Sequence, residues 1–159
     1  LCAYKQGGSI EKDDVDKVCI KTPEASVYNL SKWILARDAG QALSVLDELF
    51  FMRLEPMMIL YTVSSVYVDM CRLYVTGKKG MKISETAALF GYKGREFVLE
   101  RAAQNLKKMD FKRLSLSFNA LILADKGLKT AGADPRTVLE QLTVRLIYII
   151  AKGETVDQA

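Results

Sequence analysis

The sequence contains no histidine, and only three cysteines and three prolines are present among its 159 residues. Without histidine the chain cannot form a thiolate–imidazole zinc site, a histidine general base or a Ser-His-Asp triad. Cys2, Cys19 and Cys71 are odd in number and widely spaced, so we interpret them as reduced thiols of a cytoplasmic protein. We therefore predict no metal ion, no cofactor and no catalytic residue.

Nucleotide-binding and membrane motifs are also lacking. Gly7-Gly8 and the segment 77–80 do not have the spacing and the Gly-Lys-Ser/Thr ending of a P-loop. The apolar run 56–68 is too short and too polar to span a bilayer, and the first residues lack the pattern of a signal peptide. We expect neither a membrane partner nor a small-molecule substrate. Because the chain begins at Leu1 instead of Met, we expect it to be part of a longer protein.

What is present is an ordinary globular composition, with 50% hydrophobic and 26% charged residues. The net charge of +4 is unevenly distributed along the chain. Residues 78–113 carry 10 basic and 4 acidic groups, whereas the segments before and after them carry a net charge of −2 and 0. A basic surface can therefore come only from the middle of the chain.

Apolar residues recur at intervals of three and four, which predicts an all-α fold, a helical bundle of about six to seven helices. A short acidic helix over 9–20 is expected first. The predicted helices of the bundle are 25–36, 39–52, 56–76, 84–90, 94–108, 111–130 and 135–151. The first two should pack as an antiparallel pair, and the 56–76 helix, which is apolar around most of its circumference, should be central.

Helix-start residues and inward-facing stripes support these boundaries. Ser84, Asp110 and Asp134 are predicted N-caps, and Pro135 suits the first turn of the last helix. Asp125 and Lys129 are four residues apart and can pair on one helix face. Residues predicted to face the core include Val27, Leu30, Ile34, Ala42, Leu46, Leu49, Phe97, Val98, Ala102, Leu106, Leu114, Phe118, Leu121, Leu128, Val138, Leu139, Leu142, Leu146 and Ile149.

One segment, 83–101, resembles a helix-turn-helix unit. Lys93 and Arg95 lie where such a motif places the start of its DNA-reading helix. Lys78, Lys79 and Lys82 lie just upstream, so these five cations are candidates for nucleic-acid contact. Against this, the second helix offers Glu96 and Glu100 instead of base-reading side chains. Simple packing of a helical hairpin remains the favoured interpretation.

A second candidate is Asp69, which lies within the very apolar 56–76 helix. A buried carboxylate with a shifted pKa can mark a functional site. We favour instead a position on the solvent or partner face of the helix. Arg72, three residues later, is the obvious ion-pair partner in either case.

The order of these signals resembles the C-terminal part of the delta subunit of bacterial DNA polymerase III, a component of the sliding-clamp loader. The similarity extends from about Ile10 to Leu146, with two departures: Arg37-Asp38 replaces a common Gly-Asp, and Lys93-Gly94-Arg95 is more basic than usual. The residues that occupy the family pattern are Tyr28, Leu30, Ala42, Leu43, Leu46, Leu49, Glu55, Pro56, Arg72, Leu73, Ala87, Gly91, Asp125, Lys129, Asp134 and Pro135.

This resemblance implies an all-α collar-like domain over residues 23–153, which assembles the loader into a ring with its other subunits. It also implies that residues 1–22 end a preceding small helical, lid-like domain, and that 154–159 form a polar tail. The expected function is oligomerisation in DNA replication, with no chemistry of its own; the sliding clamp and DNA are reached through the full complex. We expect the partner surface to include the 56–76 helix and the last two helices.

The alternative is a helix-turn-helix nucleic-acid-binding protein that uses the basic 78–113 segment. A salt titration of binding to duplex DNA separates the two hypotheses, because phosphate-driven affinity falls steeply as salt rises. The alternative requires binding that has this salt dependence and that weakens when Lys78, Lys79 or Lys93 is replaced. The collar hypothesis predicts neither, and absence of binding at low salt would eliminate the alternative.

Overall fold

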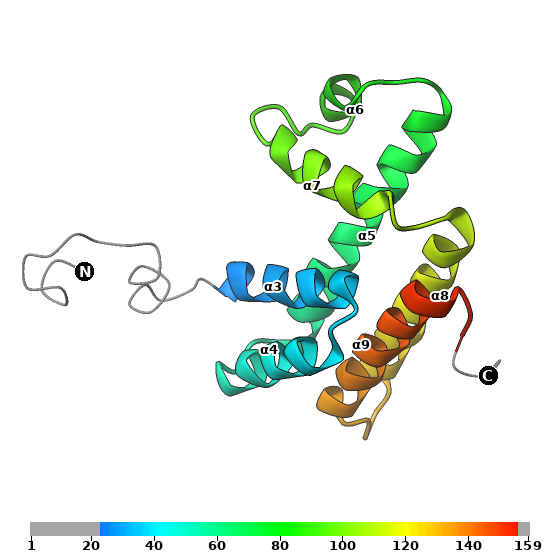
Figure 1. The fold of residues 1–159 in the computed structure, drawn as a ribbon. Coiled ribbons are helices and arrows are strands. Elements are labelled where there is room, and N and C mark those ends of the chain that lie inside the picture. Colours follow the sequence, from blue (N-terminus) through cyan, green and yellow to red (C-terminus); the bar gives the residue numbers. More distant parts are fainter. Residues whose placement is uncertain (1–22, 156–159) are drawn as a thin grey trace, which may run out of the picture.

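The computed structural model describes residues 23–155, and the side chains from Ser26 onward. The expected helix at 9–20, the rest of the segment 1–22, and residues 156–159 lie outside the described residues. Seven helices, labelled as in Figure 1, make up the described part. Their bounds are α3 Pro23–Ala36, α4 Ala39–Phe51, α5 Pro56–Lys78, α6 Ile83–Leu89, α7 Glu96–Leu106, α8 Phe111–Lys129 and α9 Pro135–Lys152.

The predicted all-α fold is confirmed, since residues 23–155 contain these helices and no strand. Most helix ends differ by one or two residues from the predicted ones. Helix α7 is shorter than predicted by two residues at each end, and α5 continues through Gly77 to Lys78. A glycine within a helix costs only about 1 kcal/mol relative to alanine, and the packing of this long helix outweighs that cost.

Helix α5 occupies the centre of the fold and contacts α3, α6, α7, α8 and α9 (Figure 1). Tyr67 and Met70, in its middle, are fully buried. The central position predicted from its apolar circumference is therefore confirmed, although Tyr61 and Val75 remain on the surface. The helices that bury α5 include one that precedes it and four that follow it in the sequence. Their packing on α5 forms one continuous hydrophobic core.

Two helical hairpins pack around the first half of α5. Helices α3 and α4 run side by side in opposite directions, as predicted, and α8 and α9 form the second pair (Figure 1). Gly127 of α8 faces Val138 of α9, where an added Cβ would lie 3.2 Å from the nearest Val138 methyl carbon. The missing side chain thus lets these two helices approach closely. The predicted Asp125–Lys129 pair is confirmed, with 2.7 Å between the charged atoms.

Helices α6 and α7 pack on the second half of α5, away from the hairpins (Figure 1). A buried hydrogen bond of 2.9 Å joins the hydroxyl of Thr86 in α6 to that of Thr76 in α5. From α7, Leu99 and Ala102 enter the core. Most contacts of α6 and α7 with the other helices are therefore made with α5, which leaves α7 open on the side that faces α3.

Two predictions in this region were wrong. Ser84 is not the N-cap of α6: Lys82 holds that position, and its N–H donates to the Glu85 carboxylate at 2.8 Å. Phe97 does not face the core and is 53% exposed. Leu99 and Ala102 form the buried face of α7, and Phe97 lies about 200° around the helix axis from Leu99.

The turn between α3 and α4 contains Arg37-Asp38, one of the two departures from the pattern of the family that the sequence resembles. Arg37 has a φ of +64°, in the left-handed region that favours glycine. The glycine common there in the family adopts this conformation at no steric cost, whereas arginine does so with some strain. Asp38 then caps α4 by accepting a 3.0 Å hydrogen bond from the Gln41 N–H.

Within residues 23–155, none of the helices combines the length and the apolar character needed to cross a bilayer.

The caps predicted for the last two helices are confirmed and have a consequence for acid stability. The Arg113 N–H donates to Asp110 at 2.7 Å and holds the pKa of that carboxyl below its ordinary value. The hydroxyl and then the N–H of Thr137 do the same for the pKa of Asp134. A pKa lowered by folding stabilises the native state above the pKa of the unfolded chain, and this contribution is lost as the pH falls.

We therefore predict that the free energy of unfolding decreases as the pH falls below about 4, the ordinary pKa of aspartate. The double variant Asp110→Asn/Asp134→Asn should lose less stability over the same range, because asparagine caps helices but does not titrate there. Urea unfolding of both chains between neutral and acid pH measures this. Parallel losses in the two chains would contradict the assignment.

Candidate functional site

Asp69 forms the most buried charged cluster among the described residues. It is only 5% exposed, so the expected solvent or partner-facing position was wrong. The guanidinium of Arg72 donates to Asp69 Oδ1 at 3.1 Å, which confirms the predicted pair. The Tyr92 hydroxyl, from the turn before α7, donates to the same oxygen. This tyrosine lies 23 residues from the aspartate in the sequence, so the contact depends on the tertiary fold.

The cluster anchors the turn before α7 to the central helix. Burial, followed by the hydrogen bond to Asp69, raises the pKa of Tyr92, so the phenol keeps its proton and acts as a donor at neutral pH. Arg72 also lies over the rings of Phe90 and Tyr92, with its guanidinium carbon 5.0 and 5.6 Å from the ring centroids. Charge pairing and stacking thus position the turn, which is a structural role for the aspartate.

The five cations proposed for nucleic-acid contact are all exposed, but they do not form one group. Lys78, Lys79 and Lys82 lie at the end of α5 and in the loop after it, whereas Lys93 and Arg95 lie in the turn before α7. Helix α6 separates these two segments (Figure 1). Their contact with nucleic acid stays a prediction.

The start of α7 lacks the character of a DNA-reading helix. Glu96 is its first residue, and its carboxylate accepts a 3.0 Å hydrogen bond from the Gly94 N–H. Backbone N–H donation, from Glu96 itself and then from Gly94, lowers the pKa of this carboxyl. A negative charge at the position that would approach the phosphates opposes entry into a DNA groove.

An apolar groove of about 300 Å³ lies between α5 and α8. Tyr61 and Ile122 line it and are 75% and 52% exposed. Met57 and Phe118 contribute further apolar surface, while Ser64 and Asp125 are the polar residues of the lining. An exposed apolar groove with a few polar groups is typical of a protein–protein contact surface.

A second apolar surface lies at the end of α4. Phe51 is 90% exposed, the adjoining Met52 is 40% exposed, and both line a shallow depression beside Arg136 of α9. Arg136 forms ion pairs with Asp47 of α4 and, at 2.9 Å, with Glu140. This surface was not predicted from the sequence, although consecutive phenylalanines at 50 and 51 cannot both face the core of one helix.

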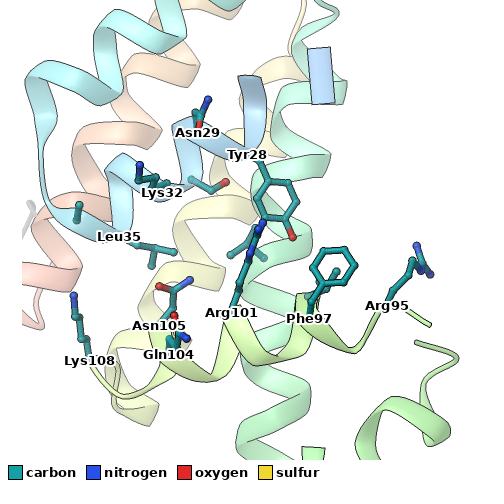
Figure 2. A pocket seen from close by; sticks show the side chains of 14 residues that line it. Tyr28, Asn29, Lys32, Leu35, Arg95, Phe97, Arg101, Gln104, Asn105 and Lys108 are labelled. Atoms are coloured by element: carbon teal, nitrogen blue, oxygen red, sulfur yellow. The ribbon is translucent and has the colours of Figure 1, made fainter. Parts of the chain in front are cut away.

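An open cleft of about 920 Å³ lies between α3 and α7 (Figure 2). Its lining includes four cations, Lys32, Arg95, Arg101 and Lys108, and no carboxylate from the described residues. Of these four cations, only Arg95 was predicted from the sequence as a site residue. The other three cations were missed because α3 and α7 are far apart in sequence and meet only across α5.

No cluster of three or more Cys, Asp or Glu side chains suited to a metal ion occurs within 23–155. Cys71 is a free, half-buried thiol. The fold and these surfaces define an all-α helical domain whose exposed apolar and basic surfaces are suited to contacts with other macromolecules.

The chain belongs to the family described as DNA polymerase III delta subunit, C-terminal domain, whose pattern matches residues 24–146. The resemblance predicted from motif order is thereby confirmed, and the helix-turn-helix alternative is not favoured.

Among solved structures, the fold is similar to the Bacillus subtilis DNA clamp loader delta protein (YqeN), with a TM-score of 0.73 and 21% sequence identity. The alignment covers 85% of this chain and 39% of that protein's chain. The chain described here thus corresponds to well under half of that relative. No curated protein sequence matches the chain.

The Asp69 cluster leads to a stability prediction. Replacing Tyr92 by phenylalanine removes the hydroxyl that donates to the buried carboxylate, and hydrogen bonds to charged groups contribute about 1.5–3 kcal/mol. We expect Tyr92→Phe to lower the free energy of unfolding by about 1.5 kcal/mol, measured by urea denaturation. Tyr61→Phe is the control, since its ring is on the surface, and should be near neutral. Equal effects of the two changes would contradict the anchoring role of Tyr92.

Proposed function

We propose that this chain is the helical oligomerisation, or collar, module of a clamp-loader delta subunit in DNA replication, without chemistry of its own. Its partners are the other clamp-loader subunits, and it reaches the sliding clamp and DNA through the full complex. The role is structural: it keeps neighbouring subunits in a fixed order, so that motions driven elsewhere in the loader are transmitted to clamp and DNA. Membership of the delta C-terminal family supports this proposal.

The observation that carries the proposal is the apolar groove between α5 and α8. Its exposed residues come from the central helix and from the helix before the last, which are among the elements expected to contact partners. A tyrosine and an isoleucine that are more than half exposed are costly to leave in water and favourable to bury against another subunit. The groove therefore suits an apolar helix face of a neighbour.

The second apolar surface, at Phe51 and Met52, fits the same function. A subunit within a ring contacts one neighbour on each side, through two different surfaces. The α4 surface and the α5–α8 groove involve separate residues and can serve two such contacts. The last helix contributes Arg136 to the rim of the α4 surface.

The domain limits follow from the same proposal. We assign residues 23–153 to the collar module, and 154–159 to a polar tail. We also assign residues 1–22 to the end of a preceding helical domain. The beginning of α3 at Pro23 and the Gly153 cap at the end of α9 support the central range.

The double variant Tyr61→Asp/Ile122→Asp tests the assembly surface. Both side chains are largely exposed, so we expect folding to persist, whereas two carboxylates in the groove should weaken assembly with the other loader subunits by about tenfold or more. Co-purification with those subunits and analytical ultracentrifugation measure the effect, and circular dichroism confirms the helical content.

Leu89→Asp is the matched control, since Leu89 is a 62% exposed leucine on α6, outside the groove. It should leave assembly unchanged. If the double variant joins the loader as well as the unaltered chain does, the groove is not the subunit contact. If the unaltered chain itself never joins the loader, the collar function is wrong.

A further inference from the structure

We propose that the cleft between α3 and α7 binds an acidic peptide segment of a partner protein. This inference does not depend on the collar function, which uses the apolar surfaces of α4, α5 and α8. The cleft and the α5–α8 groove share no lining residue. A bound peptide and a neighbouring subunit would therefore occupy separate surfaces.

The charge of the cleft points to an anionic ligand. Lys32 comes from α3, and Arg95, Arg101 and Lys108 come from α7 and the turns at its ends. None of the ion pairs between described residues includes any of these four cations. The Arg101 guanidinium lies over the Phe97 ring, 5.6 Å from its centroid. Four positive charges around one concave surface concentrate the field and attract carboxylates.

Ser31 provides a second, independent indication of a ligand. It lines the cleft from α3 and is 2% exposed, yet its hydroxyl oxygen has no hydrogen-bond partner among the described residues. A buried hydroxyl without a partner is unfavourable, and such groups are commonly completed by a ligand. The hydroxyl lies just beneath the surface of the cleft, so a bound peptide carbonyl or carboxylate can accept this hydrogen bond once the Ser31 side chain rotates toward it.

The remaining lining favours a peptide over a nucleic-acid strand. Leu35, Val66 and Val98 form apolar surface next to Ser31, which suits an apolar side chain between acidic neighbours. Single-stranded nucleic acid is bound by aromatic rings spaced along a basic groove. In Figure 2 both rings, Tyr28 and Phe97, lie together toward the Arg95 end, and Lys108 lies at the other end without an aromatic neighbour.

The length of the cleft limits the length of the peptide segment that can bind in it. The 11 residues of α7 extend about 16 Å along its axis, and Arg95 and Lys108 lie just beyond its two ends. An extended peptide advances about 3.3 Å per residue, so the cleft accommodates about six residues. An acidic segment of this size, with one apolar residue near its middle, matches the cations at both ends and the apolar surface between them.

Fluorescence anisotropy tests the proposal with the full 159-residue chain. The probe is a fluorescein-labelled peptide of about six residues, with one leucine flanked by Asp and Glu, and its Asn/Gln counterpart is the control. We expect measurable binding of the acidic peptide only. Arg101→Glu should weaken it by about tenfold, whereas Lys126→Glu, the same charge change on α8 outside the cleft, should change it little. Equal losses in both variants, or no binding to the unaltered chain, would overturn the proposal.

Ser31→Ala separates a ligand-binding role from a merely structural one. Removing an unpaired buried hydroxyl should raise the melting temperature of the free chain. The same change should nevertheless lower the affinity for the acidic peptide by about fivefold. Unchanged affinity in this variant would overturn the role of Ser31 in binding.

Two further binding measurements test whether a different ligand occupies the cleft. A labelled oligo-dT strand that binds more tightly than the acidic peptide would assign the cleft to nucleic acid and overturn the proposal. The chain also carries its own acidic residues at 11–16. If Asp13→Asn/Asp14→Asn/Asp16→Asn bound the peptide about tenfold more tightly, that segment would occupy the cleft in place of a partner. Equal affinity supports the partner assignment.

Discussion

Burial of the central helix is the constraint on which the rest of this structure depends. Helix α5 carries apolar residues around most of its circumference and would expose them all if it stood alone in water. Its neighbours α3, α6, α7, α8 and α9 each cover part of it, and Tyr67 and Met70 end fully buried. Five helices pack on α5, and the helix faces that are not buried in these contacts remain on the surface. The α5–α8 groove and the α3–α7 cleft are formed by such exposed faces.

The burial of α5 also accounts for Asp69, the one charged residue in the core formed by residues 26–155. Asp69 lies on a helix surrounded by apolar packing, so its carboxylate must be paired to remain there. Arg72 supplies the charge from the same helix, and Tyr92 supplies a hydroxyl from the turn before α7. The pairing of the buried carboxylate with Tyr92 therefore fixes the turn before α7 on the central helix. Helix α7 in turn forms one wall of the basic cleft.

The surfaces divide into two chemical kinds with different consequences. The groove at Tyr61 and Ile122 and the surface at Phe51 are apolar, so they suit permanent contacts with helix faces of other subunits. The cleft at Lys32 and Arg101 is basic and partly polar, which suits a short charged segment that binds reversibly. An assembly module with both kinds can stay within a complex and still recruit a further partner.

The sequence alone determined the helices, their order and the family, because helix periodicity and capping depend on residues close together in the chain. Asp134-Pro135 and the Asp125–Lys129 pair are such local features, and the structure contains both. Only the tertiary structure decided that Asp69 is buried, that Phe97 is exposed, and that Lys32 joins Arg101 in one cleft. Each of these depends on which helices pack across α5, and that contact joins residues too distant in sequence for any local pattern to reveal.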